Sequence, residues 1–200
     1  MTKFFAPALA AAAAMLPATA SAQQLPDAKV AVVDVETAAR TCTACAVAWA
    51  NIEQQVQQAQ AFEQQVSTPL QTEGQQIQAE IRALNGAQPG EALQQRAAAF
   101  DQRRQQAAQQ IQQRRATLQR NQNYVLQQIS AQLEPAYTAV LTARRAHLIL
   151  PKSSVMAHSS AVDVTNDVIA QLNRTLTTVA TVAPAPQQPA AQPTTPTDGR

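Results

Sequence analysis

Apolar residues recur at spacings of three and four along two long polar stretches of the chain, 37–84 and 91–145. This spacing places them on one narrow face of an α-helix, while the remaining Gln and charged positions face water. The pattern therefore predicts two helices of roughly 70 and 80 Å, each with one thin seam. The seam residues are Trp49, Ile52, Val56, Ala59, Phe62, Val66, Leu70, Ile77, Ile81 and Leu84 in the first stretch, and Ala97, Arg104, Ile111, Leu118, Val125, Ile129 and Leu133 in the second.

The segment 85–90 interrupts this pattern near its middle. It contains Gly86 and Gly90, and glycine readily adopts the positive φ that ends a helix and turns the chain. We therefore expect a long antiparallel helical hairpin over 37–145 with its tip at 85–90. Such a hairpin offers no obvious pocket for small-molecule catalysis.

Short apolar runs flank the hairpin. Lys29–Val35 is β-branched and predicts a buried strand, and Leu148–Leu150 and Val155–Ala157 predict two more short strands. The segment 163–173 predicts a helix capped by Asp163 or Thr165. The predicted fold is thus mainly α with a small β hub (α+β), and so small a hub favours an oligomer with strands at the contact. The expected hub residues are Val30, Val32, Val33, Leu148, Ile149 and Leu150.

Both ends of the chain differ in composition from the rest. Residues 1–22 combine the basic Lys3, an apolar core and the small-residue sequence Ala20-Ser21-Ala22, which predicts a secretory signal peptide and a periplasmic protein. Residues 23–36 form a linker and the first hub strand, and 146–175 hold the later hub strands and the capped helix. Residues 176–200 are rich in Pro, Ala, Gln and Thr and are expected to form a disordered tail.

The mature chain is nearly neutral. The sequence has 15 basic and 13 acidic residues, and loss of Lys3 with the signal peptide leaves 14 basic residues. This balance gives no general affinity for nucleic acid. The first helical stretch is nevertheless acidic and the second basic, so ion pairs between the two helices are expected.

Two arginine pairs in the second stretch are spaced eleven residues apart, about three helical turns, so they share a face. Such a basic stripe is one way to contact anionic lipid or lipopolysaccharide phosphates. The alternative is a solvated face that pairs with Glu63 or Glu80. The stripe residues are Arg103, Arg104, Arg114 and Arg115.

The first stretch also contains a candidate hinge at Thr68, Pro69 and Gly74. Proline removes a backbone donor and clashes with the preceding turn, so a kink is expected there. The alternative is that one helix ends at Pro69 and another begins. In either case the hairpin would consist of a fixed base and a swinging tip.

The chain shows little sign of catalytic or metal chemistry. Cys42 and Cys45 could form a redox dithiol at a helix start, a local disulfide, or simply two small packed residues. His147 and His158 have no Cys, Asp or Glu at ligand spacing, so no metal is expected. No nucleophile motif, phosphate loop or clustered acid pair occurs, and we expect neither a cofactor nor an enzymatic activity.

The order of strand, hairpin, short strands and capped helix resembles the Skp/OmpH family of periplasmic chaperones. The resemblance covers 29–172 and rests on Val30–Val35, on the runs Leu148–Leu150 and Val155–Ala157, and on Ser160–Ile169, whose Val162-Asp163-Val164-Thr165 fits the family's hydrophobic-Asp-(Ile/Val)-Thr pattern. The nearly neutral arms, the cysteine pair and the long tail depart from the family.

The resemblance implies a homotrimer in which strands of three subunits form a body and three hairpins enclose a cavity. It implies an ATP-independent holdase that binds unfolded outer-membrane proteins. One alternative is a structural coiled-coil spacer or adaptor of an envelope or export assembly, and another is a coiled coil that recognises one folded partner. Suppression of aggregation of unrelated unfolded β-barrel proteins distinguishes the chaperone from both.

Overall fold

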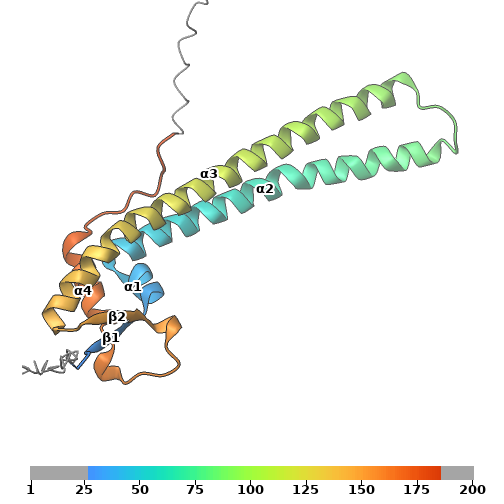
Figure 1. Cartoon of the computed structure of the whole chain (residues 1–200). Coiled ribbons are helices and arrows are strands. Elements are labelled where there is room, and N and C mark those ends of the chain that lie inside the picture. The colour runs from blue at the N-terminus through green and yellow to red at the C-terminus, as the bar shows by residue number, and fades with distance from the viewer. Residues whose placement is uncertain (1–26, 186–200) are drawn as a thin grey trace, which may run out of the picture.

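A computed structural model describes residues 27–185 and places one long two-helix arm on a small body (Figure 1). The predicted signal peptide and residues 186–200 lie outside the described residues. The class is α+β, mostly helical with a small sheet, as expected. In chain order the elements are β1 (Val30–Val33), α1 (Val35–Thr41), α2 (Thr43–Ala83), α3 (Glu91–Arg144), β2 (Leu148–Pro151), the 3₁₀ helices η1 (Lys152–Ser154) and η2 (Ser160–Val162), and α4 (Thr165–Thr175).

The arm consists of α2 and α3, joined by the turn that follows Ala83. Asn85 and Gly86 adopt positive φ angles of 47° and 92°, which reverse the chain at the tip. The sequence predicted one continuous helix from residue 37, but the structure has two. The extended backbone of Cys42 separates the short α1 from α2.

The sheet has two parallel strands, and β1 is bonded along both edges. On one side Val30 is paired with Leu148 and Val33 with Pro151. On the other side the N–H of Val164 donates to the carbonyl of Val32 at 2.8 Å. The expected strand at 155–157 is wrong, because this segment lies in a loop between η1 and η2. The edge of β1 that such a strand might have taken is occupied by residues 163 and 164.

A hydrogen-bonded relay joins the end of β1 to the start of α4. The carboxylate of Asp163 accepts from the N–H of Thr165 at 2.9 Å and from its hydroxyl at 2.6 Å. The same hydroxyl oxygen accepts from the N–H of Asp34 at 2.9 Å. Asp163 thus binds the first helical N–H although Val164 is the cap residue. The bonds from Thr165, its hydroxyl first, hold the pKa of Asp163 below its usual value.

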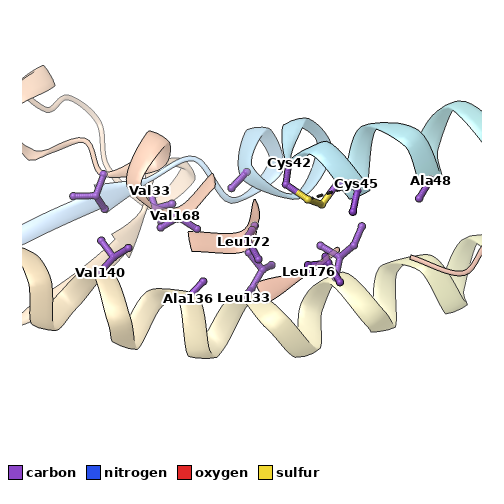
Figure 2. Close-up of a cluster of buried hydrophobic side chains, with 14 of the residues drawn as sticks. Val33, Cys42, Cys45, Ala48, Leu133, Ala136, Val140, Val168, Leu172 and Leu176 are labelled. Atoms are coloured by element: carbon purple, nitrogen blue, oxygen red, sulfur yellow. Dashed lines mark hydrogen bonds between the residues drawn. A yellow bond between two sulfur atoms is a disulfide. The ribbon is translucent and has the colours of Figure 1, made fainter. Parts of the chain in front are cut away.

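The core of the body lies where α4 packs against α1 and the base of α3, next to the start of α2 (Figure 2). Val168 and Leu172 of α4 are fully buried there. Arg144, at the end of α3, forms a bidentate ion pair with Asp167 in the first turn of α4, with N–O distances of 2.7 and 2.8 Å. The other core residues include Val33, Cys42, Cys45, Ala48, Leu133, Ala136 and Val140.

The chain after α4 returns along the arm. Leu176 is buried, and the chain then follows α3 towards the tip before it turns away from the arm (Figure 1). Val179 packs against the core, and Ala180, Thr181 and Ala183 are hydrogen-bonded to the arm. The expectation of a disordered tail from residue 176 is therefore wrong for 176–183. We call Leu176–Ala183 the strap.

The relay predicts the effect of Thr165→Val. The substitution keeps the shape but leaves the N–H of Asp34 without its partner, so we expect the free energy of unfolding at pH 7 to fall by about 1–3 kcal/mol. Urea unfolding at fixed protein concentration measures this loss. Thr142→Val is the matched control, because its exposed hydroxyl bonds only the carbonyl of Thr138 in its own helix.

The same variant has a pH signature. A carboxyl whose folded pKa is lowered stabilises the fold above its unfolded pKa of about 3.9, and this stabilisation is lost as the pH falls through the folded pKa. The difference between the parent and Thr165→Val should therefore shrink below about pH 4. An equal difference at pH 7 and pH 3 would contradict the role given to Asp163.

Candidate functional site

The outer face of the sheet carries an exposed apolar patch. Val30, Leu148 and Leu150 are 39, 37 and 38% exposed. No strand of residues 27–185 pairs with the free edge of β2. We call these three residues the outer sheet patch. Two of the other expected hub residues lie on the inner face, where Val33 is buried in the core and Ile149 packs against it. Val32 lies on the same face as Val30, because side chains alternate along a strand, but it is buried.

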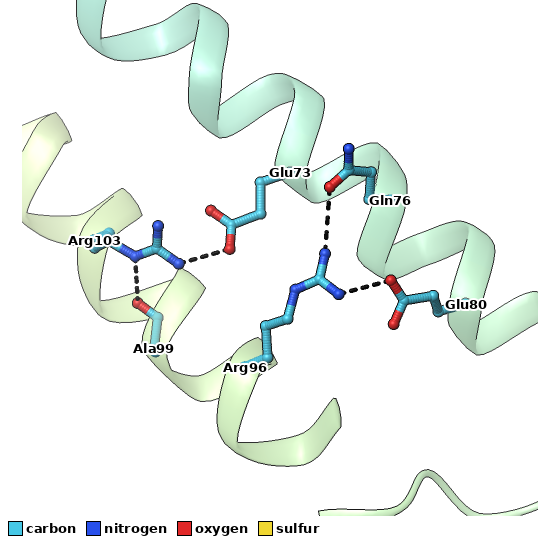
Figure 3. Close-up of polar contacts among 6 residues, drawn as sticks. All are labelled: Glu73, Gln76, Glu80, Arg96, Ala99 and Arg103. Carbon is cyan, nitrogen blue, oxygen red and sulfur yellow. Dashed lines mark hydrogen bonds and ion pairs between the residues drawn. The ribbon is translucent and has the colours of Figure 1, made fainter. Parts of the chain in front are cut away.

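Ion pairs join the two helices of the arm, as the charge pattern predicted (Figure 3). Arg96 bonds Glu80 at 2.6 Å, and Arg103 bonds Glu73 at 2.6 Å. Arg115 of α3 bonds Glu63 of α2 with distances of 2.5 and 2.6 Å. From one pair to the next, the position of the arginine moves forward along α3 while that of the glutamate moves backward along α2. The helix α3 therefore returns alongside α2. These pairs are exposed, and each contributes only tenths of a kcal/mol.

All four residues of the expected basic stripe have partners within the chain. Arg103 and Arg115 bind glutamates of α2, and Arg104 lies 3.3 Å from Asp101 on its own helix. The guanidinium of Arg114 lies over the ring of Phe62, 3.9 Å from its centre. This arrangement agrees with the solvated-face alternative. Contact with anionic lipid or lipopolysaccharide stays a prediction.

The candidate hinge residues lie in one continuous helix. The alternative in which a helix ends at Pro69 is wrong, because α2 runs from Thr43 to Ala83. Gly74 has a packing role that sequence reasoning missed: a Cβ built there would lie 3.0 Å from the ring of Phe100. The aromatic ring on α3 thus approaches the α2 backbone closely, and a methyl group at position 74 would require the ring to shift by a few tenths of an ångström.

The groove between the helices contains side-chain amides. Asn121 of α3 is buried, and its amide nitrogen donates to the side-chain oxygen of Gln55 on α2 at 2.7 Å. The sequence signal was available, since Asn121 lies between Leu118 and Val125 at a seam position. Towards the tip the groove opens into a hollow of about 530 Å³, lined by residues that include Gln55, Ala59, Phe62, Gln113, Arg114 and Leu118.

Comparison with known proteins identifies the family. The sequence matches the family of outer membrane proteins described as OmpH-like over residues 29–172. The chain belongs to the OmpH-like family. No curated protein matches it. A crystal structure from Caulobacter crescentus CB15, named as a candidate outer membrane chaperone (OmpH-like), has the same fold with a TM-score of 0.63 and 20% identity, covering 82% of this chain and 96% of that one.

The cysteines of this OmpH-like protein form a local disulfide, one of the three alternatives for the pair. The bond joins Cys42 to Cys45 at the break between α1 and α2, and both residues are fully buried in the core of the body (Figure 2). Burial removes both sulfur atoms from solvent, which argues against a redox site because thiol–disulfide exchange needs access.

The histidines have no ligand cluster around them. The Nδ1 atom of His147 accepts from the N–H of Lys29 at 2.8 Å and helps to align the start of the sheet. Nowhere within residues 27–185 do three His, Cys, Asp or Glu side chains gather as a metal site would require. Over the same residues, no helix combines the length and hydropathy needed to span a bilayer.

The disulfide should stabilise the body without serving function. It closes a loop of only four residues, for which chain entropy predicts a contribution of about 2 kcal/mol. We expect Cys42→Ala/Cys45→Ala to lower the free energy of unfolding by about this amount in urea, with unchanged suppression of client aggregation. A large loss of suppression in a variant that keeps its oligomeric state would contradict this.

Proposed function

We propose that this OmpH-like protein is an ATP-independent periplasmic holdase that encloses unfolded outer-membrane proteins between helical arms. The observation that carries the proposal is the arm itself: α2 and α3 project from the body, and most of their outer seam is only half-buried. The membership of the family and the name of the Caulobacter structure support it. Many weak contacts over such a surface suit clients that have no fixed shape.

We further propose that three chains associate through the outer sheet patch. The patch leaves three large apolar side chains exposed on a body that is small for a stable core. The free edge of β2 adjoins it, and an unpaired strand edge readily accepts another strand. A trimer would bring three arms around one space, which supports enclosure by geometry rather than by a specific pocket.

The trimer is tested by Leu148→Asp/Leu150→Asp. Two carboxylates in a buried contact are costly, so we expect dissociation into monomers at micromolar concentration, measured by light scattering. The variant should also lose suppression of aggregation towards several unrelated unfolded β-barrel proteins. Val47→Asp is the matched control, because Val47 is exposed on α2 away from the sheet.

Outcomes of these measurements separate the alternatives. A monodisperse monomer for the parent protein would reject the trimer. Protection of no unfolded client, or binding of only one folded partner, would instead favour a spacer, an adaptor or a dedicated coiled-coil receptor.

We also propose that the arm bends near Thr68 and Pro69. Pro69 lacks the N–H that would bond the preceding turn of α2, which weakens the helix there. We expect Pro69→Ala to narrow the distance distribution between spin labels at position 87 in three subunits, without dissociation. Gly74→Ala is unsuitable as a companion, since its methyl group would press on Phe100. An unchanged distribution would place the flexibility elsewhere, for example near Pro135.

A further inference from the structure

The strap is an extended segment held in the groove between α2 and α3. Its residues alternate in exposure: Val179, Thr181 and Ala183 are half-buried against the arm, and Ala180 and Val182 face solvent. This period of two is that of a β-strand with one covered face. The groove therefore already binds one extended polypeptide, which is part of the same chain.

The arm holds the strap through its backbone. Both polar atoms of the Gln128 amide bond the peptide groups of Ala180, at 2.8 Å to its carbonyl and 3.0 Å from its N–H. Gln55 donates to the carbonyl of Thr181 at 3.1 Å, and Asn121 accepts from the N–H of Ala183 at 2.9 Å. Contacts to peptide N–H and C=O groups carry no preference for particular side chains, so the groove suits many sequences of extended shape.

The strap has the composition of an outer-membrane strand. Its sequence, Leu-Thr-Thr-Val-Ala-Thr-Val-Ala, is uncharged and rich in β-branched residues. Strands of outer-membrane barrels are segments of about ten residues in which apolar and polar positions alternate. The strap lacks this alternation, but it shares the extended shape, the absence of charge and the β-branched residues of such segments.

The groove continues beyond the strap as an open hollow. Gln55 belongs both to the strap's contacts and to the hollow of about 530 Å³ nearer the tip. The hollow repeats the same chemistry, with the amides of Gln58, Gln110 and Gln113 around Phe62 and Leu118. An incoming segment can therefore enter at the hollow and extend towards the base along the path of the strap.

We propose that the groove between α2 and α3 binds extended, uncharged strand segments of unfolded outer-membrane proteins, and that the strap is a built-in competitor for it. This inference rests on the proposed holdase function and names the site and mode of client binding. The strap keeps the groove covered when no client is present. A client segment displaces it by forming the same amide–backbone bonds.

A peptide-binding measurement tests the groove directly. The strap-free variant ends at Leu176 and so keeps that buried side chain, and the matched control ends at Ala185 and so keeps the strap. The probe is a fluorescent peptide with the sequence of 177–185, followed in fluorescence anisotropy. We expect the strap-free variant to bind it at least 10-fold more tightly than the control, and Gln128→Leu to weaken that binding. Equal binding to both proteins, or no effect of Gln128→Leu, would overturn the proposal.

The full chain provides a second test that does not require a truncated protein. In the Cys42→Ala/Cys45→Ala background, Gln128→Cys and Ala180→Cys place two thiols at the strap for locking by a disulfide or a short bifunctional cross-linker. We expect locking to reduce suppression of client aggregation several-fold, and reduction of the disulfide to restore it.

The outcomes distinguish the two proposals. If the locked protein protects clients as well as the unlocked one, the strap does not compete and the inference fails, while the holdase function stands. If the parent chain, which keeps Gln128, protects no client either, the holdase function fails, and the peptide measurement still decides whether the groove binds extended segments.

Discussion

The fold depends on joining the segments before and after the arm at its base. Two long helices with one thin seam would splay apart if nothing closed them there. β1 provides the closure, because it pairs with β2 on one edge and with residues 163 and 164 on the other. The hydroxyl of Thr165 completes the link by bonding Asp34 and Asp163 together. Both the end of α3 and the start of α4 are fixed by this junction.

Packing weakens along the arm from this junction outward. Near the base α3 buries Val125, Ile129, Leu133, Ala136 and Val140, whereas farther out within the described chain it buries only the polar Asn121 and the small Ala107. The outer arm relies instead on exposed ion pairs and on the contact between Gly74 and Phe100. The side chains of the outer arm are only partly buried against one another. They can therefore exchange these contacts for contacts with another polypeptide at little cost in free energy.

The sequence predicted the features that depend on local pattern. The helices follow from periodic apolar positions, the tip from Gly86, and the family from the Asp163–Thr165 motif, whose physical meaning is the relay. It did not predict features that depend on how α2 and α3 align or on which segment occupies the edge of β1. Val155–Ala157 has strand-like composition, but Asp163 and Val164 occupy the edge of β1. Gly74 suggested flexibility because its contact with Phe100 leaves no signal in the local sequence. That contact forms only when α2 and α3 are aligned. The strap was missed because low complexity usually indicates disorder.

The parallel pairing of β1 and β2 sets the order in which the molecule can form. Lys29 and His147, which begin that pairing, are 118 residues apart. β1 therefore lacks its partner until the whole arm has become available for folding. Near the tip, by contrast, Arg96 and Glu80 are only 16 residues apart. Low contact order favours early formation, so the arm closes from its tip towards its base and the body assembles last. For that interval the apolar strand of this chain is itself an unfolded segment in need of protection.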